Sequence, residues 1–502
     1  MHYKNPIISG YNPDPSIIRV GEDYYLCTSS FEFFPGVPIY HSKNLADWEQ
    51  IGYCLTRESQ LVLHNCKPSA GIYAPTIRYQ DGTFYMITTN VTDMNTTGKG
   101  NFIVHTTDIR GEWSEPVWVD QIGIDPSLFF EEDGRAYYCG TAVQDGKQGI
   151  VLFQVNPKTG EILSDKKMIS YGCGGKYPEA PHIYKIDGRY YLMLAEGGTE
   201  YGHMVTMQRA DHIDGPYEAC PHNPIISHKD NMYSRVQCTG HADIVEDQNG
   251  CWWMVLLGSR PTGPLLHHLG RETYLTSFTW ENGWPVVPSQ LEEENDASLP
   301  GERDPHPDIF YTDFEEGRLP LAFNYVRNPE IERYGLWPDK SMLILDGEKK
   351  GLTGSWHSPT FTGIRQKGFD TVTKVRMHLT MAPGTIAGLS AYYMDTHHYE
   401  IRVNHKESGM YVELNKAIYD LEGITAAMQI KGSYIDLCIR SDKDKYYFSY
   451  SLDGAEFIPL GTALTAGLAT EATEIMTFTG TYLGIFAQNG AAGFDSFESK
   501  WQ

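Results

Sequence analysis

Residues 14–30 read DPSIIRVGEDYYLCTSS, and a related pattern returns four more times along the chain. Each copy begins with a strand-like run, passes through a charged or glycine-containing turn, and ends in an aromatic-rich run typical of a second antiparallel strand. The starts of the copies lie 60, 51, 55 and 61 residues apart. The copies are DPSIIRVGEDYYLCTSS (14–30), APTIRYQDGTFYMITT (74–89), DPSLFFEEDGRAYYCGT (125–141), APHIYKIDGRYYLMLAEG (180–197) and HADIVEDQNGCWWMVLLGS (241–259).

More strand-like sequence follows four of these hairpins, for example FIVHTTDIRGEWSEP at residues 102–116. Each repeat then holds enough strands for a four-stranded sheet, and five such sheets predict a five-bladed β-propeller. A propeller turns the first strand of every blade toward a central channel. We therefore expect the residues that begin the five repeats to converge on one axis.

The repeats end before an acidic, proline-containing stretch, EEENDASLPGERDPHPD at residues 292–308, which is typical of a linker. Beyond it, segments such as TVTKVRMHLTM (371–381) and HYEIRVNH (398–405) alternate apolar and polar residues. The chain is thus predicted to be all-β and to have two domains. These are the propeller over residues 1–308 and a β-sandwich of the concanavalin-like jelly-roll type over residues 309–502, with only short helices in either.

The composition narrows the function classes. The 502 residues carry a formal net charge of −24, which argues against nucleic acid and anionic membranes as partners because a phosphate surface attracts basic proteins. The aromatic share of 13% suits a β-rich fold with sugar-stacking side chains. Nine cysteines without a C-x-x-C pair indicate buried thiols in a reducing compartment. The chain has neither an apolar leader nor an apolar run near the roughly 20 residues of a membrane span, so we expect a cytoplasmic protein.

Three carboxylates stand at repeat starts. Asp14 and Asp125 begin their repeats, Glu179 directly precedes Ala180, and His241 begins the fifth repeat. Asp-Pro alone is a common turn signal, but acidic residues at equivalent places in three blades crowd negative charge around one axis. That arrangement is costly unless a function retains it. Glycoside hydrolysis uses such groups: one carboxyl protonates the leaving oxygen, another activates water or attacks the sugar, and a third can tune the acid.

The chain resembles glycoside hydrolase family 43, in the branch of β-xylosidases and α-L-arabinofuranosidases with a C-terminal β-sandwich, through the ordered motifs NPIISGYNPDPSIIRVGEDYYLCTSS, GIYAPTIRY, IDPSLFF, YPEAPHIYKIDGRYYLMLAEGG and TGHADIVEDQNGCWW. The resemblance spans nearly the whole chain. It implies that Asp14 is the general base, Glu179 the general acid, and Asp125 the residue that orients and tunes that acid. The implied activity is exo-acting, inverting hydrolysis that releases terminal β-D-xylose or α-L-arabinofuranose from hemicellulose-derived oligosaccharides.

The same resemblance implies sugar contacts from six further residues: Phe31, Tyr73, Thr199, His241, Arg271 and Tyr482. Tyr73 departs from the tryptophan expected at its place in GIYAP, and its hydroxyl could favour arabinofuranose over xylopyranose. Tyr482, in FTGTYLGIFAQN, would belong to a sandwich loop that closes the site and makes cleavage exo. Spacing alone leaves open a plain ion pair for Arg271, a structural core position for His241, and simple domain packing for the loop.

Two other interpretations stay open. Invertase-like glycosidases also join a propeller to a sandwich, retain configuration and act on fructosides, but they carry Asp-Pro-Asn and Glu-Cys where this chain has DPS and EAP. A non-catalytic carbohydrate-binding propeller is the second alternative, because a fold does not determine a function. Hydrolysis requires no cofactor, and the one ion considered is a structural Ca²⁺ near His241. The expected partners are a xylo- or arabino-oligosaccharide substrate and further copies of the chain in a homo-oligomer, without nucleic acid or membrane.

Overall fold

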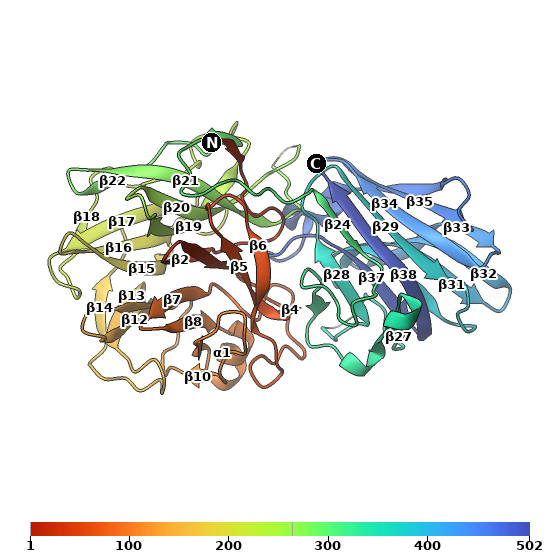
Figure 1. The fold of residues 1–502 in the computed structure, drawn as a ribbon, viewed down its shortest axis with the longest axis horizontal. Helices are drawn as coiled ribbons and strands as arrows, with labels where there is room; N and C mark the ends of the chain where they lie inside the picture. The colour runs from red at the N-terminus through yellow and green to blue at the C-terminus, as the bar shows by residue number, and fades with distance from the viewer. Residues whose placement is uncertain (1, 264, 355) are drawn as a thin grey trace.

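The structure is a computed structural model that describes residues 2–263, 265–354 and 356–502. Its strands form two bodies that lie side by side, an N-terminal body drawn from red to green and a C-terminal body drawn from teal to blue (Figure 1). The all-β class predicted from the sequence is confirmed.

Five four-stranded antiparallel sheets make up the N-terminal body within the described residues, and each sheet contains one of the sequence repeats. In each sheet the strands follow chain order, except that the first sheet leaves out the two-residue strand β4. The sheets are β2 (Ser16–Val20), β3 (Asp23–Cys27), β5 (Gly36–Ser42) and β6 (Glu49–Leu55); β7 (Thr76–Gln80), β8 (Thr83–Thr89), β9 (Asn101–Thr106) and β10 (Val117–Trp118); β11 (Ser127–Phe130), β12 (Ala136–Gln144), β13 (Lys147–Gln154) and β14 (Lys167–Ser170); β15 (Glu179–Ile186), β16 (Arg189–Glu196), β17 (Met204–Ala210) and β18 (Glu218–Ala219); and β19 (Gln237–Glu246), β20 (Trp252–Ser259), β21 (Arg271–Glu281) and β22 (Trp284–Val286).

The first strands of these sheets contact one another in a cycle: β2 with β7, β7 with β11, β11 with β15, β15 with β19, and β19 with β2. The N-terminal segment also joins the last sheet, because Ile8 forms a β-bridge with Thr273 of β21. Nearby, the Asn12 N–H donates to the Arg271 carbonyl oxygen at 2.9 Å. The starts of the five repeats therefore surround one centre.

Turn chemistry explains why the repeats fold as hairpins. The turn Asp81–Gly82 has φ of 47° and 80°, and the turn Asp187–Gly188 has φ of 49° and 78°. Asp tolerates this left-handed backbone region and Gly enters it without a steric cost, so such two-residue turns match the twist of the strands that they join. The aromatic runs that follow these turns become β8 and β16.

Helix is confined to short pieces, as the sequence predicted. The α-helix α1 (Val91–Thr97) is capped at its start by the Asn90 side chain, which accepts hydrogen bonds from the N–H groups of Thr92 and Asp93. It ends at Gly98, whose φ of 75° is the usual left-handed helix cap. The remaining helical turns are 3-10 pieces in the C-terminal half: η1 (Ile331–Arg333), η2 (Pro338–Lys340), η3 (Thr465–Leu468) and η4 (Thr470–Ala472).

The C-terminal body is a sandwich of two antiparallel sheets. Apolar side chains of both sheets, such as Val375, Leu437, Ile401 and Ile485, form one buried core, and β29 alternates buried with more exposed residues as the sequence pattern predicted. One sheet has the order β26 (Tyr334–Trp337), β27 (Met342–Gly347), β38 (Gly490–Trp501), β29 (Thr371–His378), β34 (Tyr434–Ser441), β35 (Lys445–Leu452) and β36 (Ile458–Leu464), with β24 (Ile309–Thr312) also paired to β38. The other has the order β28 (Phe361–Arg365), β37 (Tyr482–Gln488), β30 (Ile386–Met394), β31 (His397–Lys406), β32 (Gly409–Ile418) and β33 (Leu421–Ile430).

The two bodies are tied together by backbone pairing and by a buried arginine. Strand β4 (Phe33–Phe34) of the N-terminal body pairs with β25 (Tyr325–Val326) of the C-terminal body, whereas β1 (His2–Lys4) and β23 (Glu294–Asp296) pair within the N-terminal body. Beside β25, the fully buried Arg327 donates to both carboxylate oxygens of Asp395, at 3.2 and 2.9 Å, and to the Cys66 carbonyl oxygen of the N-terminal body. The Arg327 N–H also donates to the Glu32 carbonyl oxygen at 2.7 Å, so the sandwich is held directly against the turn that contains Phe31.

Candidate active site

Four of the five residues that begin the repeats share an uncommon backbone conformation, Ala74 being the exception. The φ angles of Asp14, Asp125, Ala180 and His241 are 57°, 54°, 51° and 47°, in the left-handed region that non-glycine residues seldom adopt. Each such residue costs roughly 1–3 kcal/mol, and strain of this kind gathers at functional sites. The four positions are thus equivalent in conformation as well as in sequence, and they aim side chains at the shared centre.

Asp14 is buried and surrounded by groups that favour its charged form. Its Oδ1 lies 3.2 Å from Arg271 Nη1 and 3.3 Å from His241 Nδ1, and its Oδ2 accepts a hydrogen bond of 2.6 Å from the Ser29 hydroxyl. Burial alone would raise the pKa of Asp14, but the charge of Arg271, then His241, then the Ser29 hydrogen bond hold that pKa below its usual 3.8. Asp14 is therefore ionised at neutral pH and can accept a proton.

Asp125 and Glu179 have the opposite electrostatics. Burial, then the charges of Glu179 and Asp14, raise the pKa of Asp125 well above its ordinary value. Burial and the charge of Asp14 also raise the pKa of Glu179, against the effect of a hydrogen bond from Gln148. Because ionising both is mutually unfavourable, the two carboxyls together keep a proton at a pH where Asp14 has none. The Asp125 carboxyl accepts a hydrogen bond of 3.2 Å from the Ala180 N–H. Because Ala180 directly follows Glu179 in the chain, this bond holds Asp125 next to Glu179.

The loop before Glu179 is organised by a buried carboxylate. Glu196 accepts the N–H groups of Cys173 and Gly175, both at 2.7 Å, and the Thr206 hydroxyl at 2.6 Å. A side chain at Gly175 would bring a Cβ within 2.7 Å of Glu196, so only glycine fits this close approach. The loop thereby delivers Glu179, which is partly exposed, to the edge of the site.

An aromatic wall stands beside the carboxyls. The ring of Phe31 lies 5.3 Å from Tyr73 and 5.7 Å from Phe478, and Tyr73 lies 5.8 Å from Phe478, between ring centroids. The Arg271 guanidinium lies over Phe31 at 5.8 Å and over Phe478 at 5.3 Å, and it donates to the Thr199 hydroxyl at 2.8 Å. Such a wall of aromatic faces next to polar groups suits a sugar ring, which has an apolar face and polar edges.

Tyr482 occupies a different place from the one that the resemblance implied. Its side chain is fully buried, stacks on Phe33 at 4.1 Å, and bonds to Arg365 and Asn324. The expected approach of the sandwich loop is present, but the residue that meets the wall is Phe478, whose N–H donates to the Ser69 hydroxyl at 2.9 Å. The physical reason is position: Tyr482 begins β37 inside the joint, whereas Phe478 lies in the preceding loop.

The surroundings of His241 do not fit a calcium ion. Besides Asp14, the acidic neighbour of His241 is Asp243. Asp243 already accepts hydrogen bonds from Arg78, Tyr184 and Ser16, and Arg78 also donates to His182 at 2.9 Å. A guanidinium therefore supplies the positive charge there, and Ca²⁺ would need several free oxygen ligands. Across residues 2–263, 265–354 and 356–502, no group of three or more His, Cys, Asp or Glu side chains could hold a metal ion.

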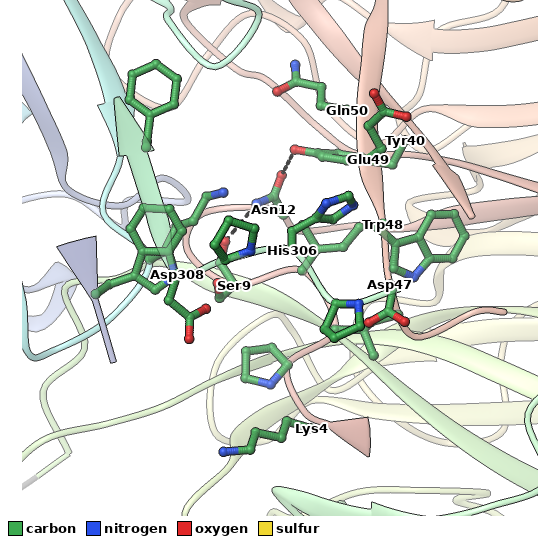
Figure 2. A pocket seen from close by; sticks show the side chains of 18 of the residues that line it. Lys4, Ser9, Asn12, Tyr40, Asp47, Trp48, Glu49, Gln50, His306 and Asp308 are labelled. Carbon is green, nitrogen blue, oxygen red and sulfur yellow. Dashed lines mark hydrogen bonds between the residues drawn. The ribbon is translucent and has the colours of Figure 1, made fainter. Parts of the chain in front are cut away.

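A cavity of about 670 Å³ lies behind the site, between the two bodies (Figure 2). Asn12 lies in its wall, where the Asn12 Oδ1 accepts hydrogen bonds of 2.6 Å from both Tyr40 and Arg365. None of the three carboxyl residues of the site lines this cavity. It is therefore a feature of the domain joint and separate from the carboxyl cluster.

Sequence reasoning named the three carboxyls, Phe31, Tyr73, Thr199, His241 and Arg271, and the structure brings these residues together around one centre. It missed Ser29, Gln148 and Phe478. Ser29 ends the repeat DPSIIRVGEDYYLCTSS together with Ser30, and Phe478 begins FTGTYLGIFAQN, but nothing in those letters tells which member faces the site. Gln148 lies in the third repeat's second hairpin and carries no motif at all.

Comparison with known proteins gives a consistent result. A family model described as Glycosyl hydrolases family 43 matches residues 3–285, and one described as Beta xylosidase C-terminal Concanavalin A-like domain matches residues 311–500. The chain is 36% identical to a non-reducing end alpha-L-arabinofuranosidase of Bacteroides ovatus over 510 residues, covering 99% of this chain and 94% of that protein. It is 32% identical to a beta-xylosidase of Bacillus subtilis, with 97% of each covered. A solved structure of a xylan beta-1,4-xylosidase from Bacillus halodurans matches with a TM-score of 0.92 at 32% identity, covering 99% of this chain and 100% of that one.

Two further findings concern the cysteines and the length and polarity of the helices. All nine cysteines are free, and seven of them are buried. In the described part of the chain, every helix is too short or too polar to cross a bilayer.

Proposed function

The chain belongs to family 43 of the glycosyl hydrolases and is an exo-acting glycoside hydrolase, and from that premise we propose that it releases a terminal pentose, β-D-xylose or α-L-arabinofuranose, from short hemicellulose-derived oligosaccharides. This membership sets aside the non-catalytic and the invertase-like alternatives. We further propose that the five sheets are the blades of one propeller, that the chain divides at Asp308, and that hydrolysis proceeds with inversion.

The observation that carries the proposed mechanism is the electrostatic contrast among three neighbouring carboxyls. Asp14, ionised beside Arg271, acts as the general base that removes a proton from the attacking water. Glu179, with its raised pKa, acts as the general acid that protonates the leaving oxygen. Asp125 holds the backbone next to Glu179 and tunes the acid through its charge. Side chains supply both proton transfers, so the reaction as proposed needs no cofactor.

Separate residues would hold the sugar. Arg271 and Thr199 provide polar contacts, and Phe31, Tyr73 and Phe478 provide the apolar face. The loop that contains Phe478 comes from the sandwich and contacts Phe31 and Tyr73 of the wall, which supports a site that admits only a chain end. The names of the relatives support both pentoses, and the Tyr73 hydroxyl is the feature that would favour arabinofuranose. The cytoplasmic location and the homo-oligomeric state stay predictions.

The test compares purified wild type with a Glu179→Gln variant on p-nitrophenyl β-D-xylopyranoside, p-nitrophenyl α-L-arabinofuranoside and xylobiose. We expect wild type to cleave at least one pentoside, and the variant to lose at least about a hundredfold in kcat on xylobiose, whose poor leaving group needs the acid. The aryl substrates need less protonation and will lose less. Proton NMR of the first product formed from xylobiose should show the anomer opposite to the substrate, and the same anomer would refute inversion.

A further inference from the structure

Glu179 receives a hydrogen bond from outside its own sheet. Gln148, near the start of β13, donates through Nε2 to Glu179 Oε1 at 3.2 Å and to the Pro178 carbonyl oxygen at 3.3 Å. One amide group therefore holds both the carboxyl and the backbone directly before it. Glu179 itself lies on β15, so the contact bridges two neighbouring sheets.

This contact makes the two oxygens of the acid unequal. An amide N–H donor stabilises the oxygen that bears no proton, so Oε1 is the carbonyl oxygen when Glu179 is protonated. The proton then resides on Oε2. A general acid works only if its proton points at the leaving oxygen, and a carboxyl free to rotate spends part of its time with the proton turned away.

Gln148 also lines a cavity of about 400 Å³, which Glu179 itself does not line. Ile122 and Val143 line it as well and are 61% and 71% exposed, so they give this cavity an apolar rim. Because the acid protonates the oxygen of the leaving group, the departing sugar lies on the acid's side of the broken bond. A cavity of this volume with an apolar rim and an amide in its wall suits a sugar unit.

We propose that Gln148 is a positioning residue that holds Glu179 with its protonated oxygen toward the leaving group, and that the cavity lined by Gln148, Ile122 and Val143 receives the sugar that departs. The proposal rests on the proposed function, because it assigns the leaving-group side of that same site. It adds a second residue from the third sheet, whose repeat begins with Asp125. The other charged groups that face Glu179 are Asp14 and Asp125.

The first experiment measures Gln148→Met, which keeps the length of the side chain and removes its donor. We expect kcat on xylobiose to fall about tenfold, and kcat on a dinitrophenyl pentoside, which leaves without protonation, to change less than about twofold. The alkaline limb of the pH–rate profile should move to higher pH, because the lost hydrogen bond stabilised the carboxylate. Gln144→Met, the same change on the same hairpin without a bond to Glu179, is the matched control and should leave both substrates and the profile unchanged.

The second experiment measures Val143→Ser and Ile122→Ser against oligosaccharides of increasing length. We expect KM for xylobiose and longer chains to rise severalfold while aryl pentosides, which lack the second sugar, keep wild-type values. If Gln148→Met loses kcat equally on xylobiose and on the dinitrophenyl pentoside, or if its alkaline limb does not move, the proposed positioning of Glu179 is wrong. If Val143→Ser and Ile122→Ser change KM equally for aryl pentosides and for oligosaccharides, the cavity does not receive the departing sugar. Failure of wild type on every pentoside would instead reject the proposed function itself, so the two failures are distinguishable.

Discussion

Removal of the Ser29 hydroxyl should shift the acid limb of the profile of kcat/KM against pH. Ser29 is fully buried and donates to the Asp14 Oδ2 at 2.6 Å, in a hydrogen bond to a charged acceptor. Such bonds contribute roughly 1.5–3 kcal/mol, and a tenfold change in an ionisation equilibrium corresponds to about 1.4 kcal/mol. In Ser29→Ala the carboxylate loses that stabilisation, while Arg271 and His241 remain. The pKa of Asp14 therefore rises, and the acid limb of the pH–rate profile should move up by about one pH unit. This shift corresponds to the lower end of the energy range, because a water molecule in the space left by the hydroxyl replaces part of the lost hydrogen bond.

The assay is the pH dependence of kcat/KM on an aryl pentoside, because this ratio reports the ionisation of free enzyme. Below the limb, Ser29→Ala should be roughly tenfold slower than wild type, and above it the two should agree within about twofold. Ser30→Ala is the matched control, since Ser30 is equally buried but its hydroxyl accepts the Val37 N–H and bonds no carboxyl. An unmoved limb in Ser29→Ala, or an equal shift in Ser30→Ala, would refute the assignment of Asp14 as the ionised base.

Two predictions concern the joint between the bodies. Phe478→Ala should lower kcat/KM on xylobiose about 2- to 10-fold, because the sugar loses one of the three rings of the aromatic wall, a contact worth about 0.5–1.5 kcal/mol; a steady-state comparison with unchanged kcat/KM would contradict a closing role for the loop. Arg327→Met should lower the free energy of unfolding by about 3–5 kcal/mol in urea titrations, because Asp395 is left as an unpaired buried charge, and adding Asp395→Leu should recover most of that loss.

The repeats illustrate what local sequence can specify. Asp81–Gly82 and Asp187–Gly188 both adopt the left-handed turn that joins two antiparallel strands, and the aromatic runs after them continue as β8 and β16. Five such hairpins at a near-constant spacing predicted five sheets, and equivalent starts predicted that Asp14, Asp125 and Glu179 would meet. These inferences succeeded because each depends on chemistry within a few residues and on repetition.

The position of the sandwich loop could not be predicted from local sequence. Phe478 and Tyr482 stand four residues apart in the stretch FTGTY, and both are aromatic. Which of them faces the aromatic wall depends on where β37 begins and on how Phe478 docks against Ser69, which is 409 residues away in sequence. Contacts of that separation arise from the packing of whole domains, and no local pattern encodes them.

The sequence by itself determined the all-β class, the repeat and the family resemblance, and it predicted the three candidate carboxyls. Only the tertiary structure decided which carboxyl is charged, because the pKa of Asp14 depends on Arg271, 257 residues away, and on the Ser29 hydroxyl at its back. It also decided that Gln148 reaches the acid from another sheet. The physical reason is that strand periodicity is a property of neighbouring residues, whereas electrostatic energies depend on distances of a few ångströms that only the folded chain establishes.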